Sequence, residues 1–185
     1  MAVCNSNLID PEQGVFSVLG LVAFRLSGLG GHYFWQCEDI DGEMAKGAAF
    51  HAWAPEDAKE GGLAIASITV VDASNDPTEP DVSVLEQDDV PRVDGILQKD
   101  LGALLVANGM ELIFWMSSQL NQSDGFKGLV TVYIASDQGK QRQSIALRIK
   151  AKNRKIVVIG DFDIEKKEIL AAPIFNVMRN MVLLD

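Results

Sequence analysis

The sequence is poor in the residues that carry most enzyme chemistry, because its 185 residues include only two histidines and two cysteines. Cys4 and Cys37 are too few for a disulfide framework, which favours a reducing, cytoplasmic compartment. The chain has no phosphate-binding glycine loop and no G-x-S-x-G, H-E-x-x-H or C-x-x-C motif. These absences remove the usual signatures of hydrolases, nucleotide-binding enzymes and metal centres. They favour a non-enzymatic protein without a cofactor and without a bound metal.

Long hydrophobic runs are also missing. The longest apolar stretch, residues 14–31, is interrupted by Ser17, Arg25 and Ser27, and it falls short of the ~20 apolar residues that a membrane span requires. Acidic residues precede this stretch, where a secretory signal would carry positive charge. With 48% hydrophobic residues and a net charge of −10, the chain is expected to fold as one globular domain over residues 1–185.

The first segment with a helical pattern lies near the N-terminus. The Asp10-Pro11-Glu12-Gln13 run has the form of a capping box, apolar residues then recur with helical spacing, and Gly28 ends the pattern. Apolar residues off the main stripe leave strand structure as the alternative. The capping box decides for a helix at 11–27.

A second helix is predicted at 91–107, because Pro91 opens an amphipathic pattern that Asn108-Gly109 ends. Two glycines inside it, Gly95 and Gly102, cost helix stability, and they predict close packing of this helix against a sheet.

A third helix is predicted at the C-terminus, where six apolar residues share one face: Leu170, Ile174, Val177, Met178, Met181 and Val182. Pro173 removes a backbone donor, so this helix is expected to begin near Ala172 or to run from Glu165 with a bend.

The remaining segments have the patterns of strands. An aromatic run at 32–37 and a partner at 46–53 are predicted to form a hairpin around Asp41-Gly42. Five further strands follow from apolar runs bounded by turn residues: 63–72, 110–118, 128–136, 142–151 and 154–162. Residues 73–90 carry prolines and acids and are expected to form a mobile polar loop, with at most a short strand at 82–85. Helices alternating with antiparallel groups predict a single-domain α+β fold, a meander of hairpins flanked by N-terminal, central and C-terminal helices.

The two histidines form the first candidate site. If Asp41-Gly42 is a two-residue turn, His32 lies opposite His51 on the paired strand, with Cys37 nearby. Such a pair can hold a metal or share a proton, which gives the alternative of a hydrolase or ligand-binding enzyme centred on this hairpin. No third ligand stands at a defined spacing, so a purely structural histidine pair is the preferred interpretation.

The distribution of charge is the most informative feature. Residues 1–100 hold 18 acids and 5 bases, whereas residues 101–185 hold 8 acids and 11 bases. An acidic patch raises the rate of association with a basic partner. The stretch from 72 to 100 is therefore the predicted partner-binding surface, through Asp72, Asp76, Glu79, Asp81, Glu86, Asp88, Asp89 and Asp94.

A basic hairpin lies at 140–155, which holds seven bases and no acid. Ile145, Leu147 and Ile149 are predicted to face the core, because they alternate with residues of the other face. That other face carries Arg148 and Lys150, with Lys152 beyond them in the turn. It gives a second alternative, a nucleic-acid-binding module, which the overall charge of −10 opposes. Protection of an exposed strand by charge is the simpler interpretation.

The order of helices and strands in a small acidic chain resembles that of type III secretion chaperones, and the absence of catalytic motifs resembles toxin-neutralising immunity proteins. Both resemblances imply a non-enzymatic cytoplasmic protein that engages, masks or inhibits a protein partner with a basic surface. Neither transfers any functional residue to this chain. Homodimer formation and the identity of the partner stay open.

Overall fold

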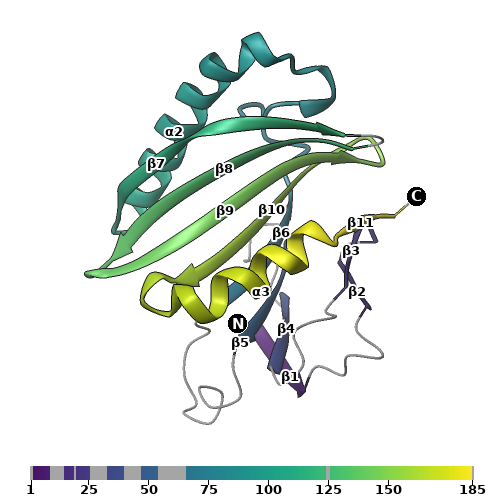
Figure 1. Cartoon of the computed structure of the whole chain (residues 1–185), viewed down its shortest axis with the longest axis vertical. Helices are drawn as coiled ribbons and strands as arrows, with labels where there is room; N and C mark the ends of the chain where they lie inside the picture. Colours follow the sequence, from purple (N-terminus) through teal and green to yellow (C-terminus); the bar gives the residue numbers. More distant parts are fainter. Residues whose placement is uncertain are drawn as a thin grey trace.

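A computed structural model describes seven ranges of the chain: 2–8, 15–18, 20–25, 33–39, 47–53, 66–123 and 126–184. Its main feature is an eight-stranded antiparallel sheet with the strand order β1-β4-β5-β6-β10-β9-β8-β7 (Figure 1). These strands are β1 (Ala2–Leu8), β4 (Tyr33–Asp39), β5 (Gly47–Trp53), β6 (Ala66–Asp72), β7 (Met110–Ser123), β8 (Phe126–Asp137), β9 (Lys140–Ala151) and β10 (Arg154–Asp163). The α+β class and the antiparallel meander are thereby confirmed.

The turns of the meander explain its register. The β8–β9 turn has positive φ at Gln138 and Gly139, and the β9–β10 turn has positive φ at Lys152 and Asn153. Two successive positive φ angles match the right-handed twist of the flanking strands, so each two-residue turn fixes one register. As a result Leu147 pairs with Val130 on one side and with Val158 on the other.

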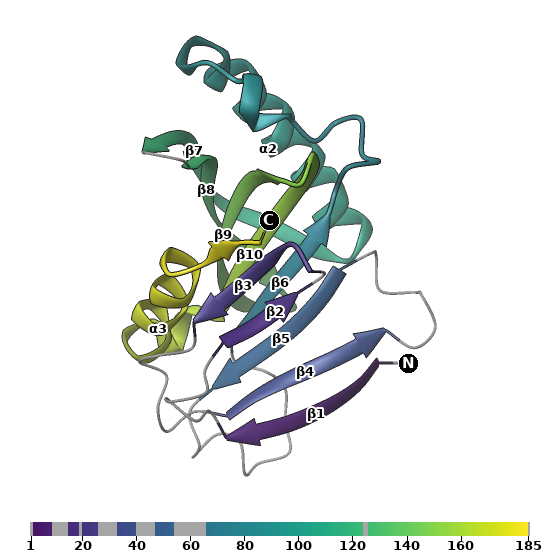
Figure 2. The same cartoon turned by 90° about the vertical axis from the view of Figure 1, so that its right-hand side faces the viewer.

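One helix lies on each face of the sheet (Figures 1 and 2). Helix α3 (Lys167–Arg179), entered through the 3-10 helix η3 (Ile164–Lys166), covers the face that carries Ile145, Leu147 and Ile149. It packs closely at Gly160, where an added Cβ would lie 2.5 Å from Sδ of Met178. Helix α2 (Val90–Ala107) covers the opposite face, mainly over β7 and β8. None of the described helices is long and apolar enough to span a membrane.

The predicted helix at 11–27 is wrong over its described part. Residues Val15–Val18 form β2 and Val22–Arg25 form β3, joined by a turn in which Gly20 has a φ of +62°. With β11 (Val182–Leu183) they make a separate sheet of order β11-β3-β2. Leu21, Val22 and Phe24 join the core beneath α3, so tertiary burial overrides the local helical pattern.

The predicted hairpin of the histidines has a different register. His51 pairs with Trp35, and Cys37 pairs with Ala49, so the strands are shifted from the expected pairing. His32 and the expected turn at Asp41-Gly42 lie outside the described residues. On its other side Cys37 pairs with Cys4 of β1.

The two later helices are confirmed with corrections. Helix α2 begins one residue before the predicted start and ends before Gly109, which has a φ of +74°. Gly95 and Gly102 do not pack against the sheet, because a Cβ added at either would have no atom within 4 Å. Helix α3 begins at Lys167 and contains Pro173, whereas Val182 lies beyond it in β11.

Candidate functional site

The acidic segment, defined here as residues 72–89, is built from a repeated local motif. An aspartate accepts hydrogen bonds from the backbone N–H and the hydroxyl of the residue two positions later: Asp72 with Ser74, Asp76 with Thr78, and Asp81 with Ser83. Such turns favour compact backbone over a strand. The structure accordingly has 3-10 helices at Val82–Val84 (η1) and Gln87–Asp89 (η2) in place of the short strand predicted at 82–85. The expected mobility of this segment stays a prediction.

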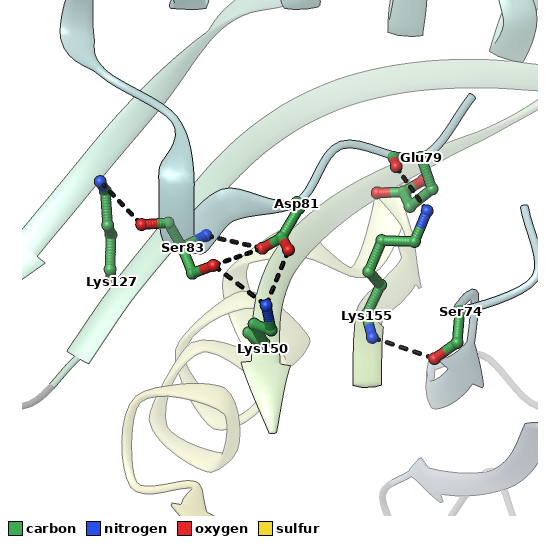
Figure 3. Close-up of polar contacts among 7 residues, drawn as sticks. All are labelled: Ser74, Glu79, Asp81, Ser83, Lys127, Lys150 and Lys155. Carbon is green, nitrogen blue, oxygen red and sulfur yellow. Dashed lines mark hydrogen bonds and ion pairs between the residues drawn. The ribbon is translucent and has the colours of Figure 1, made fainter. Parts of the chain in front are cut away.

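The acidic segment lies on the basic hairpin formed by β9 and β10 (Figure 3). Nζ of Lys150 lies 2.7 Å from a carboxylate oxygen of Asp81 and 3.2 Å from the hydroxyl of Ser83. Arg154 pairs with Asp72 at 2.6 Å. Lys155 donates through Nζ to the backbone oxygen of Glu79 at 2.8 Å, and the same ammonium also reaches the backbone oxygen of Asp76. The two charged regions that the sequence separates therefore neutralise each other within one molecule.

Glu79 and Arg148 form the most buried contact between the two regions. Nε of Arg148 lies 2.6 Å from Oε1 of Glu79, and the side chains are 13% and 11% exposed. Neither of these two atoms has a hydrogen-bond partner outside the pair among the described residues. Burial penalises the charged carboxylate and raises the pKa of Glu79, an effect that the nearby Arg148 only partly offsets.

The aspartates of the segment behave in the opposite way. The hydrogen bond from Lys150, followed by the one from Ser83, lowers the pKa of Asp81 to about 2. The hydroxyl of Ser74 and the backbone N–H of Thr78 lower the pKa of Asp72 and Asp76, respectively. These carboxylates are thus held ionised by their local turns and their cationic neighbours.

A buried polar network continues from Arg148 to helix α2. Nη1 of Arg148 contacts the hydroxyl of Thr131 at 3.3 Å, and that hydroxyl lies 2.7 Å from the hydroxyl of Ser118. The backbone N–H of Ser118 donates to Asp94 at 2.6 Å, and Nε1 of Trp115 donates to the same oxygen at 3.1 Å. Asp94 therefore anchors α2 to β7, a role distinct from the surface position expected for it.

A groove of about 520 Å³, called here the loop groove, separates the acidic segment from the start of α2. Six of its lining residues are apolar or proline: Pro77, Pro80, Val84, Leu85, Val93 and Ile96. Val84 and Ile96 are 73% and 41% exposed, so the groove offers apolar side-chain surface to solvent. The charged residues on its lining include Asp89 and Arg92, whose side chains form an exposed ion pair at 3.7 Å.

The remaining predicted partner-binding acids lie near this groove. Glu86 is exposed and pairs with Lys127 at 3.5 Å, while its backbone N–H donates to Asp89. Asp88 is exposed and has no ion pair among the described residues. Of the eight predicted acids, Asp72, Glu79 and Asp81 form ion pairs with the basic hairpin, whereas Asp76 is exposed and contacts Lys155 through its backbone oxygen. Binding of a partner by this segment stays a prediction.

The other predicted site residues are the histidine pair with Cys37 and the basic face of the hairpin. His32 and the side chains of His51 and Cys37 lie outside the described part of the structure, so the histidine alternative stays a prediction. No group of three or more histidine, cysteine or acidic side chains that could hold a metal occurs in the part of the chain that the structure describes. Lys152, in the exposed turn of the basic hairpin, donates to the backbone oxygen of Gly20 at 3.1 Å. Arg148 and Lys150 lie on the predicted strand face, but the acidic segment covers that face, so the hairpin does not offer a free row of cations.

Two features of the sequence together indicate this arrangement of the acidic segment on the basic hairpin. Nine acids at 72–100 and seven bases at 140–155 are complementary within one chain, and the repeated D-x-[ST] spacing indicates ordered turns. Both features were visible, but their pairing depends on contacts between residues about 70 to 80 positions apart.

Comparisons with known proteins establish the fold. No family model matches this chain, and no curated protein matches it in sequence. The fold is similar to that of the cyanobacterial PsbP protein CyanoP from Synechocystis sp. PCC 6803, with a TM-score of 0.60 and 10% identity over 97% of this chain and 92% of that chain.

Two further solved structures share less of the geometry. LpqN, involved in cell envelope biogenesis of Mycobacterium tuberculosis, has a TM-score of 0.35 at 10% identity, covering 100% of this chain and 86% of that chain. The immunity protein TplEi of the T6SS from Pseudomonas aeruginosa has a TM-score of 0.39 at 11% identity, covering 99% and 92%. These two likenesses carry no functional argument. The comparison with CyanoP shows a PsbP-like α+β fold, and any function must be argued from the surface of this chain itself.

Proposed function

We propose that this chain is a non-enzymatic protein-binding module that holds a segment of a partner polypeptide in the loop groove. The observation that supports the proposal most directly is a groove with exposed apolar walls beside acids that the basic hairpin does not use. The partner segment that fits carries large apolar side chains next to lysine or arginine.

The apolar part of the groove supplies the affinity. Val84 from η1 and Ile96 from α2 both line the cavity, and both have apolar surface left to bury. Burial of such surface is the main favourable contribution when proteins associate, and a few central side chains carry most of it. Pro77 and Pro80, which also line the groove, lose little conformational entropy when a partner orders them.

The charged rim supplies selectivity. Glu86 and Asp88 are exposed and directly follow or precede the lining residues Leu85 and Asp89 in the chain, and the segment carries further acids whose fields add to theirs. Because rim charges act mainly on the rate of encounter, the acids would favour a basic partner without contributing most of the affinity. The internal pairing of Asp81 and Glu79 with the hairpin holds the loop wall in place beside α2.

Selection from a random peptide display library against the full chain tests the proposal. We expect selected peptides to combine large apolar residues with lysine or arginine. Val84→Asn and Ile96→Asn should each weaken their binding about tenfold, as for central interface residues. Leu104→Asn is the matched control, because Leu104 is an exposed apolar residue of the same helix that does not line the groove.

Charge is tested separately with Glu86→Gln and Asp88→Asn combined. This double variant should slow peptide association at low salt, and the difference from the wild-type protein should shrink at high salt. Binding that is equally strong in the Val84 and Ile96 variants would place the partner elsewhere on the protein. Selected peptides without basic residues would remove the role assigned to the acidic rim.

A further inference from the structure

The sheet face opposite to the acidic segment is only half covered. Helix α3 contacts β10 and β6, whereas β7 and β8 extend beyond it (Figure 1). Phe114 and Met116 of β7 pair with Ile134 and Val132 of β8, and Val132 packs against the core beneath α3. Paired residues share one face of a sheet, so these apolar side chains lie on the α3 side. Phe114 and Met116 remain 47% and 45% exposed there.

A pocket of about 570 Å³, called here the α3 pocket, lies where the C-terminal half of α3 meets this open face. Its apolar lining comes from the sheet through Val130, Ile145 and Leu147, and from the helix side through Phe175, Met178 and Met181. Sites for small ligands typically have about 300–1,000 Å³ and a mainly apolar lining. The close contact of α3 with Gly160 fixes the helix on β10, so the helix cannot simply move across to fill the space.

Among the described residues, two polar side chains line the α3 pocket, Arg179 and Asn121. Arg179 is exposed in the last turn of α3, and no ion pair or hydrogen bond of its guanidinium occurs among the described residues. In the hairpin, by contrast, Arg148, Lys150 and Arg154 are paired with Glu79, Asp81 and Asp72, respectively. Within the described part of the chain, the α3 pocket is thus an apolar cavity with one unpaired cation at its edge, Arg179, and such a cavity is complementary to a molecule with an apolar chain and one negative charge.

We propose that the α3 pocket binds a long-chain carboxylate, with the alkyl chain on Val130, Leu147 and Phe175 and the carboxylate at Arg179. A guanidinium binds a carboxylate through two parallel hydrogen bonds, and Asn121 offers a further amide donor at the same edge. The size of the pocket and its apolar lining oppose a small polar anion. This site is independent of the loop groove, so either proposal can fail without the other.

Calorimetric titration of the full chain with octanoate, decanoate and dodecanoate tests the alkyl part of the proposal, at concentrations below micelle formation. Each added pair of methylene groups should tighten binding about tenfold if the chain is buried. Phe175→Ser should weaken decanoate binding about tenfold, because it removes an apolar wall. Ile169→Ser is the matched control, since Ile169 is an exposed apolar residue of the same helix outside the pocket.

Titration with decanol separates the contribution of the carboxylate from that of the alkyl chain, because decanol has the same chain as decanoate and no charge. Arg179→Gln should weaken decanoate binding about threefold to fivefold, as expected for an exposed ion pair, and it should leave decanol binding unchanged. Lys167→Gln at the other end of α3 should change neither. Absence of chain-length dependence, or equal losses in the Ile169 and Lys167 controls, would overturn the proposal.

Sedimentation of the same samples excludes a competing occupant. A protein that is dimeric, that becomes monomeric with Phe175→Ser and that binds no decanoate would show that a second copy of the chain covers this face. That outcome would also overturn the proposal.

Discussion

Replacement of Arg148 by methionine should strongly destabilise the protein. The change leaves Glu79 as a buried carboxylate without its partner, at a site where both side chains are less than 15% exposed. Breaking a buried ion pair from one side typically costs about 3–5 kcal/mol. For a protein of this length, that corresponds to a decrease in Tm of roughly 6–20 °C. The sequence alone placed Arg148 on the exposed face of the hairpin, whereas the structure buries its side chain against Glu79.

The pH dependence makes the test specific. Because the pKa of Glu79 is raised in the folded protein, the folded state binds more protons than the unfolded state between the two pKa values. The favourable contribution of protonated Glu79 to the free energy of unfolding is therefore complete below its ordinary pKa, and it is lost as the pH rises through its pKa in the folded protein. Without Arg148 the pKa of Glu79 in the folded protein rises further. The loss of stability in Arg148→Met should therefore be larger at pH 8 than at pH 5.

Urea denaturation followed by circular dichroism gives the free energy of unfolding at both pH values. The double variant Glu79→Leu with Arg148→Met should lie within about 1 kcal/mol of the wild-type protein or above it, because desolvation of both charges is removed. Arg92→Met is the matched control, since it removes an exposed pair and should cost less than about 0.5 kcal/mol. A loss below about 1 kcal/mol in Arg148→Met at pH 8, or the same loss at both pH values, would refute the buried-pair account.

Three further predictions concern stability. Gly95→Ala and Gly102→Ala should each raise the free energy of unfolding by up to about 1 kcal/mol, because the new Cβ meets no atom, and a decrease at either would mean that α2 is covered. Gly160→Ala should lower the Tm markedly, because its Cβ would lie 2.6 Å from Cγ2 of Ile174, a stiff β-branched side chain that cannot turn away as Met178 can, and an unchanged Tm would show that α3 does not sit on β10 as described. Asp81→Asn should be less stable than the wild-type protein at pH 6, and the difference measured in urea should shrink as the pH falls towards about 2, because ionised Asp81 contributes stability only above its folded pKa.

Local sequence patterns predict only part of the candidate site, because some of its contacts join residues far apart in the chain. Acidity, prolines and the start of α2 can be recognised in the sequence, because these features depend on neighbouring residues alone, whereas the role of the segment in binding stays a prediction. Whether an aspartate faces solvent or a lysine depends on what the fold brings beside it, and Lys150 is 69 positions from Asp81. The α3 pocket has no sequence signature at all, since its lining comes from β7, β8, β9 and α3.

The sequence by itself determined the elements whose signals are local and mutually consistent. Turn residues at 138–139 and 152–153, together with strict alternation along β9, were enough to define the meander, and Pro91 with Gly109 bounded α2. Burial of alternate residues permits only one register, because a slip by one residue would move Leu147 to the other face.

Only the tertiary structure determined the secondary structure of the N-terminal segment and the partners of the charged side chains. Residues 15–25 satisfy a helical pattern locally, but pairing of β3 with β11 and burial of Phe24 beneath α3 stabilise strands there. Likewise, the acidic segment and the basic hairpin each look like separate binding surfaces until the fold places them in contact. Interactions between distant segments contribute more free energy than local preference in both cases, and a local pattern does not contain them.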